Sequence, residues 1–155
     1  MSRKFKIITH PNPLLRKKSV KIAKKEISSK KFQELCLNMA RTMKEKDGVG
    51  LSAPQIRQNI RLITVNTKEG PVHMINPKIK RKSWKKEWGE EGCLSVPDVF
   101  GEVKRNYKIT YAYLDKKGQT KKTWATGLMA RVIQHEIDHL DGILFIDKTK
   151  NIKGA

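Results

Sequence analysis

The chain has 155 residues, which at roughly 100 to 200 residues per domain allows one globular domain and leaves no room for a two-domain enzyme. Its 34 Lys and Arg residues against 15 Asp and Glu give a formal net charge of +19, and its two cysteines are too few for the disulfide framework of a small secreted protein. No apolar run approaches the ~20 residues of a membrane-spanning helix. We therefore expect one domain over residues 1–155, in the cytoplasm or an equivalent reducing compartment.

A net charge this far from zero attracts polyanions such as RNA, ribosomes or acidic membranes. The basic residues are mostly Lys and are spread along the whole chain, which favours a solubilising surface over a dedicated nucleic-acid face. Association with ribosomes through this surface stays open. No acidic residue precedes Glu26. Because an acid-poor basic start can mark an organelle transit segment, an organelle also stays open as the location.

The stretch from Ser28 or Ser29 to Lys46 predicts an amphipathic helix. A Ser stands at the N-cap position, and apolar residues follow at spacings of three and four, at Phe32, Leu35, Cys36, Met39 and Met43. Cys36 therefore lies on an apolar stripe. We expect it to be a core residue and not a nucleophile or a metal ligand.

From residue 61 onward the pattern turns extended. Alternating apolar and polar residues, rich in β-branched and aromatic types, occur at 61–65, 72–75 and 102–114. A turn at 115–118 then leads to a further extended stretch at 119–125, so the sequence predicts strands and a hairpin. His73 alternates with apolar neighbours and has no other ligand type beside it. We expect it to face solvent, as we do for His10 in its turn.

The last predicted element is a helix that begins near Gly127 and ends near Gly142, because glycine often follows a helix end. It contains an HExxH motif at 135–139. On a helix the two imidazoles project from the same face, one turn apart, where both can reach one metal ion. Leu128 and Val132 lie on the same stripe. The predicted fold class is α+β, with antiparallel sheets packed around this C-terminal helix and an N-terminal amphipathic helix.

A catalytic metal site needs three protein ligands and an open position, so His135 and His139 need a third donor. Only 16 residues follow His139, and they include Asp141 and Asp147 but no Glu, His or Cys. This argues against a zinc peptidase whose third ligand lies well downstream. Upstream, Cys93 in the stretch EGCLS could complete a site of two His and one Cys.

The segment GVGLSAPQ at 48–55 follows the first predicted helix. Glycines and small residues let the backbone come close to a ligand. The same composition is also typical of an ordinary Gly-rich turn at the end of a helix. Taken alone, this segment leaves both interpretations open.

Together, three segments resemble the peptide deformylase family, whose motifs are, in order, a GxGxAAxQ-like loop, EGCLS and QHExDHLxG. In this chain they are GVGLSAPQ at 48–55, EGCLS at 91–95 and QHEIDHLDG at 134–142. The start PNPLLRK from Pro11 is also similar, so the resemblance covers nearly the whole chain. One departure is Ser52, where the family often has Ala, which adds an oxygen that can form a hydrogen bond near the site. The other is the end at residue 155, without the longer C-terminal helix that some bacterial members use on the ribosome.

The resemblance implies a hydrolase that removes the formyl group from the N-terminal formylmethionine of newly synthesised polypeptides and releases formate. It implies one divalent metal ion bound by Cys93, His135 and His139, with Fe²⁺ as the native metal and Zn²⁺ as the alternative. It also implies that Glu136 is the general acid and base. The cofactor is therefore expected to be a single ion in a site softer than that of most HExxH peptidases.

For the substrate, the resemblance implies that the Gln55 side chain and the Leu94 backbone N–H stabilise the oxyanion. The segments that hold the substrate backbone match Gly50 and Gly92. The walls of the pocket for the methionine side chain match Val49, Leu128 and Val132. The expected partners are N-formylmethionyl nascent peptides, with no membrane.

Two other functions compete with this one. The first is an HExxH metallo-endopeptidase, for which the residues after His139 offer no Glu, His or Cys as a third ligand. The second is a basic RNA-associated or ribosome-associated protein with a structural metal, which leaves Glu136 and Gln55 without a role. Both fit the motifs less well than a deformylase.

Overall fold

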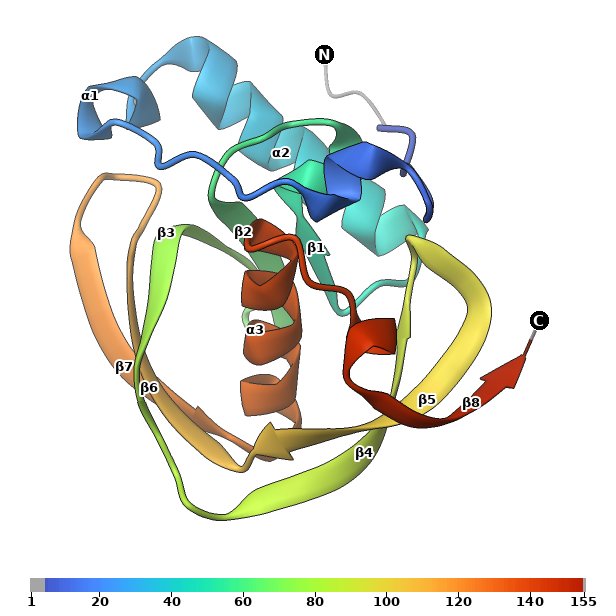
Figure 1. Ribbon diagram of the computed structural model, residues 1–155. Coiled ribbons are helices and arrows are strands. Elements are labelled where there is room, and N and C mark those ends of the chain that lie inside the picture. The colour runs from blue at the N-terminus through green and yellow to red at the C-terminus, as the bar shows by residue number, and fades with distance from the viewer. Residues whose placement is uncertain (1–4, 155) are drawn as a thin grey trace.

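The computed structural model describes residues 5–154. It is an α+β fold in which two antiparallel sheets surround one central helix, as Figure 1 shows. The acid-free N-terminal stretch lies partly outside the described residues. Among the helices of the described part, none combines the length and the apolar character needed to cross a membrane.

The larger sheet has five strands in the order β1-β2-β3-β6-β7. Their bounds are Gly50–Ser52, Leu62–Thr67, Gly70–Lys82, Lys108–Leu114 and Thr120–Thr126. The smaller sheet has three strands in the order β4-β5-β8, with bounds Lys86–Cys93, Val96–Asn106 and Thr149–Gly154. All pairings within both sheets are antiparallel.

The amphipathic segment near the N-terminus forms α2 (Lys30–Glu45). The Ser29 side chain caps this helix by accepting a hydrogen bond from the Phe32 N–H at 3.2 Å. Its buried stripe, which includes Cys36, Met39 and Met43, packs on one face of the larger sheet against Leu51, Leu62 and Ile75. The short helix α1 (Lys24–Ile27) and the 3₁₀ turns η1 (Pro13–Arg16), η2 (Ala53–Ile56) and η3 (Phe145–Asp147) connect the other elements.

The helix that carries the HExxH motif is α3 (Gly127–Leu140). Gly142 follows it at φ +75°, a left-handed conformation that favours glycine. The Ile143 N–H donates to the Asp138 carbonyl and the Gly142 N–H to the His139 carbonyl, which is the Schellman pattern of a helix end. A Cβ on Gly142 would lie 2.4 Å from the Arg16 carbonyl oxygen, so only glycine fits here.

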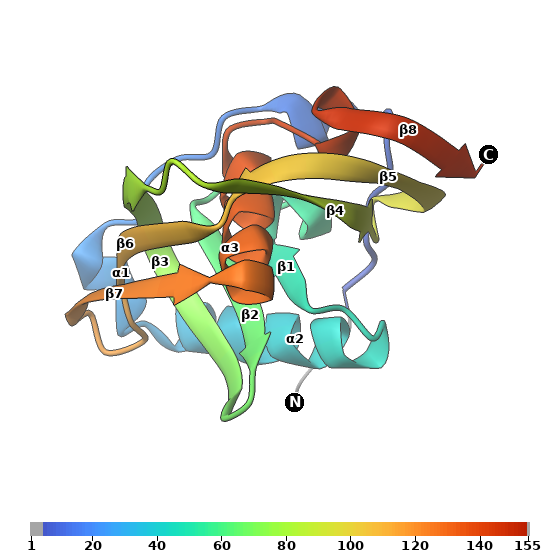
Figure 2. The ribbon, with the colours of Figure 1, turned by 90° about the horizontal axis from the view of Figure 1, so that it is seen from below.

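Two helices cover opposite faces of the larger sheet. Along β2, Leu62 packs with the α2 cluster, whereas Ile63 and Val65 pack with the apolar residues of α3. Figure 2 shows α3 between the two sheets and α2 on the far side of the larger one. A third apolar cluster, which includes Val103, Leu144 and Phe145, lies beneath the smaller sheet. This packing holds α3 rigidly at the centre.

The hairpin predicted around 115–118 is present as β6 and β7, with the Asp115 N–H bonded to the Gln119 carbonyl. The single strand predicted at 102–114 is wrong, because the chain bends at Tyr107 and passes from β5 to β6, in different sheets. The Tyr107 N–H is bonded to the Lys85 carbonyl instead of a strand partner within either sheet. The sequence pattern alone also missed β1, β4 and β8.

The expectation that His73 faces solvent is wrong. His73 is 6% exposed, and its Nδ1 lies 2.7 Å from the Thr64 hydroxyl on the paired strand β2. The alternation of residues was correct, but both faces of this sheet are covered here, so neither set of side chains reaches water. His10 is exposed and Cys36 is 1% exposed, as predicted.

Candidate metal centre and active site

A cavity of about 510 Å³ opens beside α3, between β1 and the turn that joins β4 to β5. The site residues predicted from the sequence line it, with the exception of the more deeply buried His139. They are Val49, Gly50, Gln55, Gly92, Cys93, Leu94, Leu128, Val132, His135 and Glu136. Three segments that are distant in the sequence therefore meet in one place.

Cys93, His135 and His139 form a cluster in which one donor atom of each lies within 4.8 Å of the others. The Cys93 Sγ lies 3.3 Å from the His139 Nε2. His135 uses its Nδ1 for Glu91, at 2.9 Å, which leaves its Nε2 as the available nitrogen. Burial and the neighbouring His135 lower the pKa of His139, which favours the neutral imidazole that binds metals. One sulfur and two imidazoles suit a borderline or soft divalent ion, and a carboxylate behind one imidazole is typical of metal sites.

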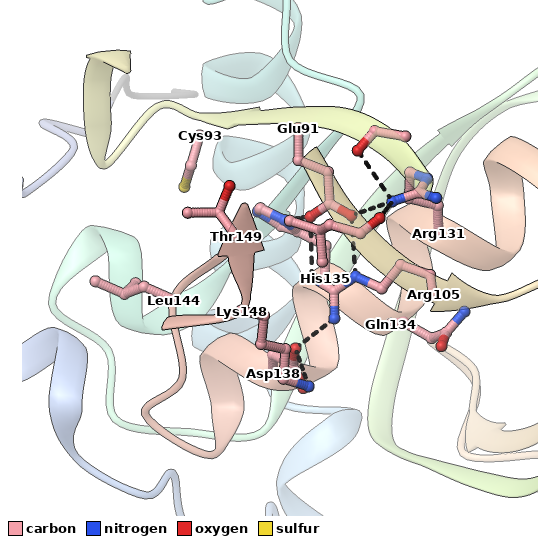
Figure 3. Close-up of polar contacts among 12 residues, drawn as sticks. Glu91, Cys93, Arg105, Arg131, Gln134, His135, Asp138, Leu144, Lys148 and Thr149 are labelled. Atoms are coloured by element: carbon pink, nitrogen blue, oxygen red, sulfur yellow. Dashed lines mark hydrogen bonds and ion pairs between the residues drawn. The ribbon is translucent and has the colours of Figure 1, made fainter. Parts of the chain in front are cut away.

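Glu91 on β4 orients His135 and is itself held by two arginines, as Figure 3 shows. Its carboxylate accepts two hydrogen bonds from Arg105, both at 2.9 Å, and one from Arg131 at 2.7 Å. Arg105 also contacts Asp138 of α3 at 2.6 Å. Because each charge has a partner of opposite sign, this buried network fixes β4, β5 and α3 relative to one another.

The electrostatics of Glu91 follow from these contacts. Burial would raise the pKa of its carboxyl, but hydrogen bonds from His135 and Arg105 outweigh burial and hold the pKa well below its ordinary value. Glu91 therefore stays ionised and accepts a hydrogen bond from the His135 ring. Sequence reasoning missed Arg105, Arg131 and Asp138 as supporting residues. The sequence offered only a weak signal for Arg105. This arginine alternates with the buried Val103 along a strand, which places a charged residue on the inward face.

Glu136 faces the cavity without a partner for one of its oxygens. Its Oε1 is buried and has no hydrogen-bond partner among residues 5–154. Burial raises the pKa of this carboxyl to about 7, although the nearby His135 opposes the shift. A Cβ on Gly50 would lie 2.6 Å from the Glu136 Oε2, so the glycine lets this carboxylate lie against β1. The sequence left the role of the 48–55 segment open, and the structure shows its backbone close to the Glu136 side chain.

Ser52 and Ser95 orient the amide of Gln55. The Gln55 Oε1 accepts hydrogen bonds from the Ser52 N–H at 2.9 Å and the Ser52 hydroxyl at 3.0 Å. The Gln55 Nε2 donates to the Ser95 hydroxyl at 3.0 Å and points toward the Cys93 Sγ at 3.6 Å. The serine that departs from the family pattern thus forms the additional hydrogen bond that the sequence suggested. With its oxygen occupied and one N–H donated to Ser95, Gln55 directs its other N–H toward the Cys93 side of the site.

The remaining predicted residues form the walls and the mouth of the cavity. Val132 on α3 is 8% exposed, whereas Leu128 and Val49 are 73% and 57% exposed at the opening. Gly92 lies beside Phe100, whose ring would be 2.8 Å from a Cβ at that position. Phe100 is half exposed and was not predicted from the sequence. An apolar rim around a polar centre suits a substrate with an apolar side chain next to the reacting group.

Comparison with known proteins agrees with this geometry. The family described as polypeptide deformylase matches residues 4–155. The chain belongs to the polypeptide deformylase family. A peptide deformylase from Desulforudis audaxviator is 42% identical over 149 residues, which cover 96% of this chain and 95% of that protein.

Solved structures show the same fold as this deformylase. The peptide deformylase of Thermotoga maritima superposes with a TM-score of 0.91 at 35% identity, covering 96% of this chain and 99% of that one. A Met-Ala-Ser-bound class I type b peptide deformylase from Acinetobacter baumannii gives the same values. Deformylases are metal-dependent hydrolases that remove the N-formyl group from newly synthesised polypeptides, and this is the activity of the chain.

Proposed function

We propose that this deformylase cleaves N-formylmethionyl peptides at the cavity beside α3, with Glu136 as the group that transfers protons. One observation carries the proposal. The buried Glu136 Oε1 lacks a partner in the described part of the chain, and it comes from the residue next to His135 in the cluster with Cys93 and His139. A buried carboxylate oxygen that no protein donor occupies is free to receive a proton during the reaction.

We propose that Cys93, His135 and His139 hold one divalent ion, Fe²⁺ in the native enzyme, with Zn²⁺ as the alternative. When bound there, the ion supplies Lewis-acid polarisation and lowers the pKa of water. The affinity order favours Zn²⁺, whereas cellular supply and the family resemblance favour Fe²⁺. Metal analysis of protein purified without oxygen distinguishes the two. Iron in stoichiometric amount supports the proposal, and zinc in protein prepared without oxygen contradicts it.

Glu136 accepts a proton as water attacks the formyl carbon, and it then delivers that proton to the leaving amine nitrogen. The carbon–nitrogen bond breaks, and the products are formate and the free N-terminus. Gly50 has no side chain to displace the Glu136 carboxylate from this position. The same carboxylate therefore serves first as a base and then as an acid.

Negative charge that develops on the formyl oxygen is stabilised by hydrogen-bond donors. The Gln55 amide supplies one N–H group, and hydrogen bonds to Ser52 and Ser95 fix the orientation of the amide. Leu94 follows Cys93 at the end of β4 and lines the same cavity, and its backbone N–H would be the second donor. Each such donor is typically worth ~3 to 4 kcal/mol in the transition state.

The substrate methionine side chain fits against Val49, Leu128 and Val132, and the peptide backbone runs past Gly50 and Gly92. The Met-Ala-Ser peptide bound to the Acinetobacter baumannii enzyme supports a methionyl peptide as the ligand class. We further propose that the enzyme works in the cytoplasm, where nascent formylated chains are made, and that its positive charge favours association with ribosomes.

Three peptides test the proposed function: formyl-Met-Ala-Ser, acetyl-Met-Ala-Ser and a longer peptide with a free N-terminus. Formate release from the first peptide alone is the expected result. Cleavage inside the third peptide would instead indicate an endopeptidase. A metal-loaded protein that leaves all three peptides intact would indicate a binding protein with a structural metal.

A further inference from the structure

The outer face of the larger sheet is covered only in part. α2 packs over β1, β2 and the first half of β3, where Leu62, Ile75 and Leu114 join its apolar cluster. Beyond Ile75 and Leu114 the same face continues over the second half of β3 and over β6 and β7 (Figure 1). No other helix or strand of the described residues covers this part. Its outward side chains therefore meet solvent.

The strand register shows which side chains share this face. Arg81, Thr110 and Trp124 form one row across β3, β6 and β7, and Lys78, Ala112 and Lys122 form the next. The intervening residues Ile79, Ile109, Tyr111 and Ala125 point the other way, into the α3 cluster. Lys108 shares the outer face, because its Nζ lies 4.9 Å from the centre of the Trp124 ring. We call Lys78, Arg81, Lys108, Lys122 and Trp124 the basic sheet face.

Acidic residues are absent from the strands that build this face. Residues 70–86 contain no Asp or Glu and six basic residues, which are Lys78, Lys80, Arg81, Lys82, Lys85 and Lys86. Residues 108–114 and 120–126 also contain no Asp or Glu. On α2, by contrast, Glu34 and Glu45 stand among four basic residues. The uncovered part of the sheet therefore carries positive charge with no carboxylate on its own strands.

Exposed tryptophan accompanies this charge. Trp124 is 61% exposed, and Trp84 in the turn between β3 and β4 is fully exposed. The turn that carries Trp84 is tied to the basic sheet face, since the Ser83 N–H donates to the Lys108 carbonyl at 2.9 Å. Large aromatic side chains are usually buried, so two exposed tryptophans on or beside these acid-free strands need a reason. Flat aromatic rings among cations are the combination that binds single-stranded nucleic acid, by stacking of bases and neutralisation of phosphates.

We propose that the basic sheet face, with Trp84 at its border, binds single-stranded RNA. RNA is the polyanion that surrounds newly synthesised polypeptides, which are the substrates of this enzyme. Lys108, Lys122 and Arg81 would contact phosphates, and Trp124 would stack on a base. The face is separate from the catalytic cavity, because its side chains point away from the α3 cluster, whereas the cavity lies beside α3 on the other side of the sheet. Bound RNA would therefore leave the cavity open.

The test is fluorescence anisotropy of the metal-loaded enzyme with a labelled 12-nucleotide oligouridylate at several salt concentrations. Trp124→Ala should weaken binding about tenfold, because one stacked base is lost. The double variant Lys108→Ala/Lys122→Ala should reduce the slope of log affinity against log salt by about 1.4, which is about 0.7 for each of two phosphate contacts.

Two matched controls separate this face from general attraction by net charge. The double variant Lys31→Ala/Lys44→Ala removes the same charge from α2. Trp88→Ala removes an exposed tryptophan on the smaller sheet. Trp88 shares its strand with Glu90, and its ring lies beneath Lys104 and Lys150. Both control variants should bind RNA within about twofold of the wild type, and all variants should deformylate formyl-Met-Ala-Ser at the wild-type rate.

Several results would overturn the proposal. If the α2 double variant weakens binding as much as the sheet double variant, the attraction comes from net charge alone. If duplex RNA binds as tightly as oligouridylate and Trp124→Ala has no effect, no base stacks on the face. If phosphatidylglycerol vesicles bind and oligouridylate does not, the face recognises a membrane surface. These results concern binding only, so they are distinguishable from a failure of the deformylase assay.

Discussion

The two cysteines of this chain lie in regions of opposite character. Cys36 is 1% exposed among the apolar residues that join α2 to the larger sheet, and burial raises the pKa of its thiol to about 12. Cys93 is half-buried at the end of β4, beside the His139 Nε2 and the Gln55 amide. The same residue type packs in the core in one region and is the proposed metal donor in the other, because its neighbours are hydrocarbon in the first case and imidazole in the second.

The largest expected effect separates these two cysteines. Cys93→Ala should lose the metal and lower deformylation by ~10³-fold or more, since an ion contributes several kcal/mol of transition-state stabilisation. Cys36→Ala should keep both metal and activity and cost about 1 kcal/mol of unfolding free energy. Metal content, kcat/KM and denaturant unfolding of both variants check this. Stoichiometric metal in Cys93→Ala would contradict the proposed ligand set.

The next largest effect is expected at Glu136, where catalysis should fall although the metal stays bound. Glu136→Ala should retain the metal and lower kcat by ~10²- to 10⁴-fold, because a positioned acid and base is missing. Glu136→Asp should recover little, since the shorter side chain withdraws the carboxylate from the reacting atoms. Single-turnover kinetics and metal analysis on the same sample measure both quantities. A metal-loaded Glu136→Ala protein with a near wild-type rate would remove Glu136 from the mechanism.

The polar network behind the metal site can be broken at its centre. Glu91→Gln should weaken metal binding by ~10- to 100-fold, because His135 loses its orienting carboxylate. It should also cost roughly 3 to 5 kcal/mol of unfolding free energy, since Arg105 and Arg131 lose a buried anion. Glu90→Gln, at the neighbouring exposed position, is the matched control and should change neither. Equal behaviour of the two variants would show that the network does not support the site.

The smallest effect lies on the α2 side of the larger sheet, where His73 is buried. Burial lowers the pKa of His73 to about 4 in the folded state, against an unfolded value of 6.5. The contribution of His73 to the free energy of unfolding is complete above pH 6.5, where the imidazole is neutral in both states. It is lost as pH falls toward 4, because the unfolded state then binds a proton that the folded state does not, and the loss reaches up to about 3 kcal/mol. His73→Gln should therefore make unfolding free energy less dependent on pH in this window. His10→Gln, at an exposed site, should leave the pH dependence of the unfolding free energy unchanged. A pH profile of His73→Gln identical to that of the wild type would contradict the prediction.

Much of the site could be predicted from the sequence because the positions of its residues depend on spacing within one segment. Helical geometry places His135 and His139 on one face of α3 whatever surrounds the helix. The stripe of α2 likewise follows from residue spacing, and the Ser29 cap from residue type. The metal donor Cys93 needed a further argument, since nothing in a strand ending at residue 93 specifies its distance from a helix at 135. The family resemblance supplied that link.

The features that could not be predicted depend on what lies across the fold. An alternating strand residue such as His73 meets water only if no second layer covers its face of the sheet. Trp124 meets water because α2 does not extend over its part of the sheet. The bend at Tyr107 likewise depends on hydrogen bonds to Lys85, which is distant in the sequence.

By itself, the sequence determined the HExxH helix, the apolar stripe of α2, the hairpin around 115–118 and, through its motifs, the family. Each of these depends on spacing within one segment or on residue identity. Only the tertiary structure decided that Glu91 is clamped by Arg105 and Arg131, that Gly50 makes room for Glu136, and that the basic sheet face stays uncovered. These features arise from contacts between segments far apart in the chain, whose burial and charge exist only once the sheets have closed around α3.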